Sequence, residues 1–153
     1  ITGIVIDHTN KTWKKGTNKI IYHDNEEKWS VEDKFHRIDG PAYKFHDDVV
    51  NIEKWYLHGQ RHRIDGPAYI EKYTSRSIEK WYYNDKLHRS DSHPAYIYRE
   101  NNGSKHTKKW YDHGQLQALL EWENNKIVKA EWNTKQYAEE DNDPDFLLKD
   151  WLF

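Results

Sequence analysis

The chain has 153 residues and a formal net charge of −2, from 24 Lys and Arg against 26 Asp and Glu. This length suits one domain or one repeat array, and the balanced charge gives no general attraction to nucleic acid, whose binding domains carry a basic patch. The chain has no cysteine, which excludes disulfides and thiolate sites. No apolar run reaches the ~18 residues of a transmembrane helix. We therefore expect neither a specific nucleic-acid partner nor a membrane span.

Aromatic residues replace the usual aliphatic ones. Trp, Tyr and Phe number 8, 11 and 4 and make up 15% of the chain, although all hydrophobic residues together reach only 35%. Aromatic side chains fit strands well and bury large areas. We expect them to form the core, with cation–π contacts from neighbouring lysines. The alternative is that the rings beside Lys54, Lys80, Lys108 and Lys109 bind sugars or stack on bases.

Residues 1–27 contain only a degenerate form of the pattern that follows, and we expect an N-terminal cap there. The chain begins at Ile1 and contains no Met, which indicates a processed or trimmed start.

Residues 28–117 contain an internal repeat. Trp29, Trp55 and Trp81 are 26 residues apart, and Trp110 follows after 29. The heptapeptide HRIDGPA occurs at 36–42 and 62–68, each time seven residues after a Trp, and the third copy reads HRSDSHPA at 88–95. The insertions that lengthen the third period fall at Ser92-His93 and around 101–104, where loops are expected. The repeat signature comprises Trp29, Trp55, Trp81, Trp110, His36, His62, His88, Arg37, Arg63, Arg89, Asp39, Asp65, Asp91, Gly40, Gly66, Pro41, Pro67 and Pro94.

Each unit is predicted to contain two strands. The segments 52–56 and 78–83 alternate in a way that suits strands, and partner strands are expected to start at Ala42, Ala68 and Ala95. Polar turns and the HRxDGPA segment would join them, because Gly and Pro allow sharp changes of direction. Stacking of such hairpins predicts an all-β fold, an elongated antiparallel sheet with a period of about 26 residues.

Residues 118–153 are predicted to form a C-terminal cap, with a hairpin around Asn124-Asn125 and a short final helix that starts near Asp143-Pro144. An acidic stretch precedes this helix and is a candidate partner-binding segment. Its acidic residues are Glu139, Glu140, Asp141, Asp143 and Asp145.

The pattern W-Y-x-x-G-x-x-H-R-x-D-G-P-A, densest at residues 54–69, resembles the MORN-type repeat variants of bacteria, phages and large DNA viruses. The resemblance implies antiparallel hairpins in an elongated, curved sheet. It also implies scaffold roles at proteins or membranes, and some bacterial relatives are described as antitoxin components. The ordinary MORN unit is shorter and richer in Gly, and Asp33 and Asp85 stand at the turn position that Gly59 and Gly114 occupy.

The recurring His-Arg-x-Asp sets are the strongest candidates for chemistry. HRD also occurs in protein-kinase catalytic loops, but the other kinase motifs are absent from the sequence. Three copies at a fixed period favour a structural device in which Arg and Asp pair and His bonds a turn. One histidine per unit is too widely spaced for a tetrahedral metal site, so no metal and no cofactor is predicted. Ten histidines leave a pH-sensitive surface as a further hypothesis.

These observations predict a non-enzymatic repeat module that mediates protein–protein interaction, as a component of a phage or large-virus assembly or virion. The first alternative is a small inhibitory or antitoxin-like binder that blocks an enzyme through residues 139–145. The second is a hydrolase that uses one His-Arg-Asp set. The expected partners are proteins, with homo-oligomers as another option, and the expected location is the cytoplasm, or the virion and host cytoplasm for a viral protein.

Overall fold

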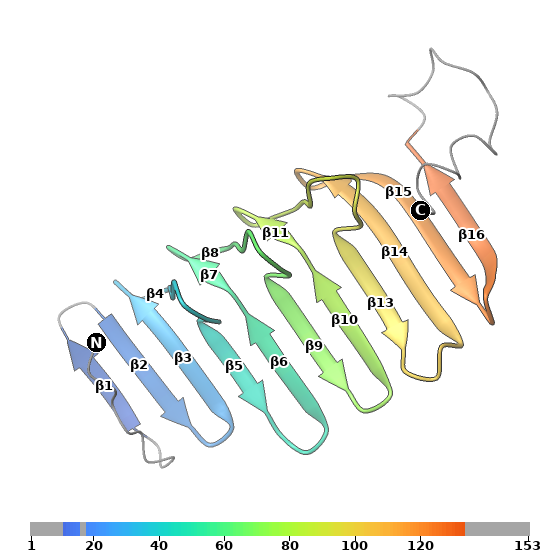
Figure 1. The fold of residues 1–153 in the computed structure, drawn as a ribbon. Coiled ribbons are helices and arrows are strands. Elements are labelled where there is room, and N and C mark those ends of the chain that lie inside the picture. The colour runs from blue at the N-terminus through green and yellow to red at the C-terminus, as the bar shows by residue number, and fades with distance from the viewer. Residues whose placement is uncertain (1–10, 16–17, 134–153) are drawn as a thin grey trace.

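The computed structural model describes residues 11–15 and 18–133. Its main element is a twelve-stranded antiparallel sheet with the strand order β1-β2-β3-β5-β6-β9-β10-β13-β14-β15-β16, in which the short β4 also pairs with β3 (Figure 1). The strands are β1 (Lys11–Lys15), β2 (Asn18–His23), β3 (Glu26–Val31), β4 (Lys34–Phe35), β5 (Tyr43–His46), β6 (Val50–Lys54), β9 (Tyr69–Tyr73), β10 (Arg76–Lys80), β13 (Tyr96–Glu100), β14 (Lys105–Asp112), β15 (Gln115–Glu123) and β16 (Lys126–Trp132). The predicted all-β sheet of stacked hairpins is confirmed.

Two short hairpins lie outside the sheet. They are β7 (Tyr56–Leu57) with β8 (Gln60–Arg61), and β11 (Tyr82–Tyr83) with β12 (Lys86–Leu87). Their tight turns hold two successive residues at positive φ, at His58-Gly59 and at Asn84-Asp85, as the common two-residue hairpin turn requires.

The predicted strand boundaries need two small corrections. The strands expected over 52–56 and 78–83 are interrupted at Trp55, between β6 and β7, and at Trp81, between β10 and β11. The partner strands start at Tyr, one residue after Ala42, Ala68 and Ala95. The three alanines are fully buried, and their carbonyls accept hydrogen bonds from the backbone N–H of Trp29, Trp55 and Trp81 at 2.7–2.8 Å. Each Ala therefore bonds to the neighbouring Trp through its carbonyl, and the regular strand starts only at the Tyr that follows.

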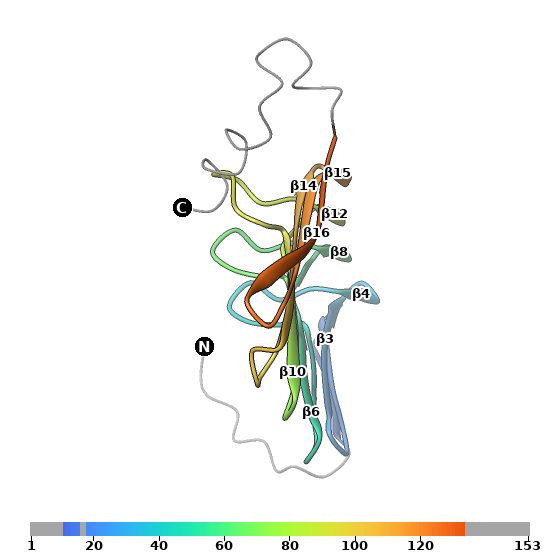
Figure 2. The same cartoon turned by 90° about the vertical axis from the view of Figure 1, so that its right-hand side faces the viewer.

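The segments that follow the short strands β4, β8 and β12 and lead to the next long strand of the sheet, residues 36–42, 62–68 and 88–95, are called crossovers here. Seen edge-on, the sheet is a single layer, the crossovers stand out on one side, and β4, β8 and β12 bend towards the other (Figure 2). We name the side with the crossovers the tryptophan face and the opposite side the tyrosine face.

The tyrosine face carries a row of alternating Lys and Tyr that crosses seven strands. Direct partners in the register are Lys28, Tyr43, Lys54, Tyr69, Lys80, Tyr96 and Lys109. Each ammonium lies 4.6–5.9 Å from the centroid of a neighbouring ring. Cation–π contacts contribute ~0.5–1 kcal/mol at exposed sites, so the row stabilises strand pairing. The predicted contacts between lysines and aromatic rings are present, and they are made mainly by Tyr.

Buried apolar side chains occur along the sheet, and their main cluster lies at one end of the described part. Trp110, Ala118, Leu120 and Trp122, from β14 and β15, form the main cluster, and Trp132 of β16 packs against it. No helix among residues 11–15 and 18–133 is long and apolar enough to cross a membrane. The predicted C-terminal helix lies outside the described residues.

Candidate functional site

Each crossover starts and ends on the same tryptophan backbone. The N–H of His36 donates to the carbonyl of Trp29 at 3.1 Å, and the N–H of Trp29 donates to the carbonyl of Ala42 at 2.7 Å. His62 and His88 repeat the first bond on Trp55 and Trp81, at 3.2 and 3.1 Å. Because Trp and His are always seven residues apart, both ends of each crossover form hydrogen bonds with the backbone of the same tryptophan.

The arginine of each crossover lies over the tryptophan ring of its own unit. The guanidinium carbon is 4.0 Å from the ring centroid for Arg37 on Trp29, and the same arrangement recurs at 4.2 Å and 4.1 Å for Arg63 on Trp55 and Arg89 on Trp81. Arg favours this stacking because its guanidinium is planar and weakly hydrated. The recurring tryptophans of the first three units are therefore each covered by the arginine of the same unit.

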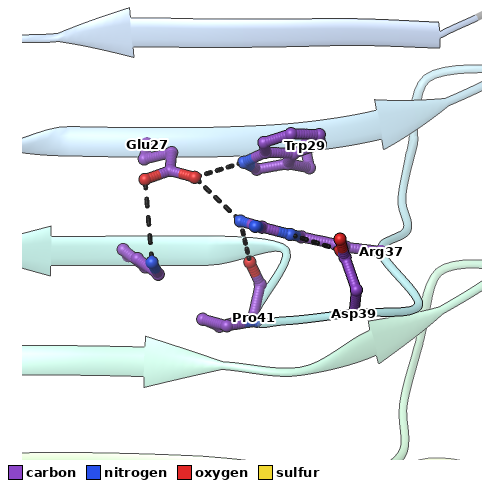
Figure 3. A network of polar contacts seen from close by, with 6 residues as sticks. Glu27, Trp29, Arg37, Asp39 and Pro41 are labelled. Carbon is purple, nitrogen blue, oxygen red and sulfur yellow. Dashed lines mark hydrogen bonds and ion pairs between the residues drawn. The ribbon is translucent and has the colours of Figure 1, made fainter. Parts of the chain in front are cut away.

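In the first unit a network of polar contacts surrounds this stack (Figure 3). Arg37 donates to Glu27 of β3 and to Asp39, both at 2.9 Å, and to the carbonyl of Pro41 at 3.5 Å. Glu27 also accepts a hydrogen bond from the Trp29 indole. The Arg37 side chain is only 17% exposed, so its charge is matched by a carboxylate from the sheet and another from the crossover.

The aspartate of the signature pairs with Arg in the first two units, as predicted. The Arg63–Asp65 distance is 2.8 Å, and the hydrogen bond from each arginine lowers the pKa of Asp39 and of Asp65. Both carboxylates remain largely exposed, and exposed ion pairs contribute little to stability. The aspartates therefore orient the guanidinium more than they stabilise the fold.

The histidine of each unit reaches the turn of the next unit, and not its own turn. The Nδ1 atoms of His36 and His88 accept from the backbone N–H of His58 and His113, at 3.0 and 3.3 Å. His62 contacts Asn84 at 2.9 Å through the same ring atom. The expectation that His bonds a turn is confirmed, and the structure adds that this bond links neighbouring units.

The third unit departs from the signature where the sequence has its extra residue. Asp91 and Ser92 adopt positive φ angles of 63° and 55°. The Ser92 carbonyl accepts from the Trp110 indole at 2.8 Å. The tryptophan of the fourth unit therefore holds the enlarged third crossover.

The contact between the third and fourth units brings together three potential metal ligands that the sequence did not predict to be close. His88, Asp112 and His113 bring one donor atom each to within 4.8 Å of one another. Asp112 Oδ1 lies 3.1 Å from His88 Nδ1 and 2.6 Å from His113 Nδ1. Counting one histidine per unit missed this group, because the second imidazole comes from the turn of the following unit. The shared HGQ triplet at 58–60 and 113–115 was the available signal.

Grooves separate the crossovers on the tryptophan face. The groove between the first and second has a volume of about 440 Å³ and is lined by Trp55, both arginines and both aspartates, among others. Ile38 and Ile64 stand at its rims and are 85% and 86% exposed. The second groove, of about 390 Å³, extends to Trp81 and Arg89. Repetition therefore produces a ridged surface with exposed isoleucines.

The candidate acidic segment, Glu139, Glu140, Asp141, Asp143 and Asp145, lies outside the described residues. Comparison of the chain with protein families, with curated proteins and with solved structures gives no match. The resemblance to MORN-type variants accordingly stays a prediction from the sequence.

Proposed function

We propose that the chain is a non-enzymatic repeat module that binds a protein partner through the ridged surface of its crossovers. The observation that carries this proposal is the exposure of Ile38 and Ile64, at 85% and 86%, at the same position of two units. Apolar side chains gathered on an exposed surface with a polar rim are typical of protein-binding sites.

The chemistry around these isoleucines defines the partner. Asp39 and Asp65 follow them directly in the sequence and are 79% and 84% exposed, whereas the arginines lie beneath. The ridges therefore present apolar groups flanked by exposed carboxylate oxygens, each of which belongs to an ion pair with the arginine of its own crossover. A complementary partner offers apolar side chains beside Lys or Arg, because matched charges speed association and favour the correct partner.

The polar groups of the His-Arg-Asp sets support a structural role over catalysis. In the first two units Arg is stacked and ion-paired, and His is bonded to the next turn. A catalytic set requires groups that converge on one reacting atom, whereas these groups satisfy one another. The role in a phage or large-virus assembly remains a prediction.

The test is affinity capture from the cells that produce the chain, with wild type compared against the double variant Ile38→Ser/Ile64→Ser. We expect the double variant to lose the stoichiometric partner and to keep its unfolding midpoint, because both side chains are solvent-exposed.

The matched control is Val49→Ser/Val128→Ser, which removes two other exposed side chains, at 60% and 55%, away from the crossovers. It should retain the partner. If both double variants captured equal amounts of the partner, the crossover surface would not be its binding site.

A further inference from the structure

We propose that His88, Asp112 and His113 bind one divalent transition-metal ion of the zinc class, and that this ion links the third crossover to the turn between β14 and β15. Among the described residues, this is the group of three His and Asp side chains whose donor atoms lie together within 4.8 Å. The proposal goes beyond partner binding and uses a different part of the surface.

The fold itself assembles the three donors. His88 begins the third crossover, where its N–H is fixed to the Trp81 carbonyl at 3.1 Å. Asp112 ends β14, and His113 opens the tight turn before β15 with a φ of 45°. The backbone N–H of His113 donates to His88 Nδ1 at 3.3 Å. An ion bound at this nitrogen would replace both this long hydrogen bond and the Asp112 contact, because a ring nitrogen binds a metal through the one lone pair of its unprotonated form.

The donor types suit a zinc-class ion. Imidazole nitrogen and carboxylate oxygen are ordinary Zn²⁺ ligands, and three protein ligands with an open fourth position are a common arrangement. Ligands at ~2.0–2.1 Å from a tetrahedral ion lie roughly 3.3 Å from each other. The observed carboxylate–imidazole distances of 2.6 and 3.1 Å are shorter than this separation, so the side chains must move apart by roughly 0.2–0.7 Å to admit the ion.

The side chains have room to adjust. His113 and Asp112 are 57% and 64% exposed, so rotation of either costs little packing. The two imidazole rings lie 4.1 Å apart, and each is 6.3–6.4 Å from the ring of Tyr83. Asp112 now bridges the two imidazoles, and an ion between the three groups would take over that bridge.

The earlier units show that the repeat does not produce such a set automatically. At the first junction His36 meets His58 with rings 4.4 Å apart, but Leu57 precedes His58 where Asp112 precedes His113. At the second junction His62 meets Asn84, and Tyr83 precedes it. Only the third of these junctions combines two imidazoles with a carboxylate, and the first serves as an internal control.

The test is titration of the untagged full chain with ZnCl₂ after dialysis against a chelator, followed by NMR of the histidine ring carbons and protons. We expect the His88 and His113 signals to shift together and to reach their end point at one equivalent. The His36 and His58 signals should stay in place.

Two variants copied from the other junctions serve as tests. Asp112→Leu reproduces the first junction and His113→Asn the second, and Asn tolerates positive φ. Each should weaken Zn²⁺ binding by at least about tenfold, the lower range for loss of a group that supports a metal site. His58→Asn should leave the affinity unchanged. The amide spectrum of each variant shows whether it is folded.

Several outcomes would overturn the proposal. One is the absence of any shift of His88 and His113 below millimolar Zn²⁺. Another is an equal response of His36 and His58, which would show nonspecific binding to histidine pairs. A third is unchanged affinity in folded Asp112→Leu.

Discussion

At the scale of single residues, a glycine lies directly against the guanidinium that stacks on tryptophan. A Cβ atom placed on Gly40 or Gly66 would come within 2.9 Å or 2.8 Å of an atom of Arg37 or Arg63. Neither glycine has the positive φ that would demand glycine for its backbone. The signature therefore contains Gly because Arg occupies the space between the glycine and the ring.

This contact predicts the effect of Gly66→Ala. The added methyl would push against the guanidinium at the flexible end of Arg63 and weaken its stack on Trp55, which should cost about 0.5–1 kcal/mol of the free energy of unfolding. Urea unfolding measures the loss. In an Arg63→Ala background the same substitution should cost much less, because the clashing group is gone. A similar cost in both backgrounds would mean that the guanidinium is not the obstacle.

His36 predicts a pH dependence of stability. Burial, and then the neighbouring His58, lower the pKa of His36 below its ordinary value of 6.5. As the pH falls, the unfolded chain therefore takes up this proton before the folded chain does. The contribution of His36 to stability is complete above its unfolded pKa and is lost as the pH falls through its folded pKa.

We expect His36→Gln, which copies the Gln117 of the fourth unit, to lose less stability than wild type between about pH 7.5 and about pH 5.5. The measurement is the urea midpoint of both proteins at each pH. An equal decrease in both would show that His36 does not titrate with folding.

At the scale of elements, strand β15 separates buried from exposed leucines. Leu120 is 2% exposed and belongs to the main apolar cluster, whereas Leu116 of the same strand is 38% exposed. Leu120→Ala should lower the free energy of unfolding by about 2–5 kcal/mol. Leu116→Ala should lie within about 0.5 kcal/mol of wild type. Chemical denaturation compares them, and equal losses would contradict the observed burial.

Much of the element order follows from sequence period alone. The Trp and Ala spacings predict the hairpins, and Asn124-Asn125 is found in the predicted final turn, between β15 and β16. The break at Trp55 was not predictable, because it depends on the Ala68 carbonyl, thirteen residues away, which bonds the Trp55 N–H. Period-two alternation contains no information about such a contact.

At the scale of the whole molecule, the described sheet is a single layer in which each strand pairs with its neighbours in the strand order. Backbone bonds join one unit to the next. The Gly59 N–H donates to the Phe35 carbonyl of β4 at 2.8 Å, and the Asp85 N–H donates to the Arg61 carbonyl of β8 at 2.9 Å. Histidine adds a side-chain bond at each junction. The sequence predicted stacking, but it could not show which turn each histidine meets, since that depends on how successive units are offset. The His88–Asp112–His113 cluster escaped prediction for the same reason.

We propose that the repeated His-Arg-x-Asp sets build the fold and do not perform chemistry. The most direct measurement is urea unfolding of three separate variants, Arg37→Ala, Arg63→Ala and Arg89→Ala. Each removes a Trp–Arg stack of similar geometry, at 4.0, 4.2 and 4.1 Å. Loss of such a stack with its hydrogen bonds should cost about 1–3 kcal/mol. We predict that all three variants are destabilised. If any one variant kept the stability of wild type and alone lost an activity or partner of the protein, the structural role of its His-Arg-x-Asp set would be contradicted.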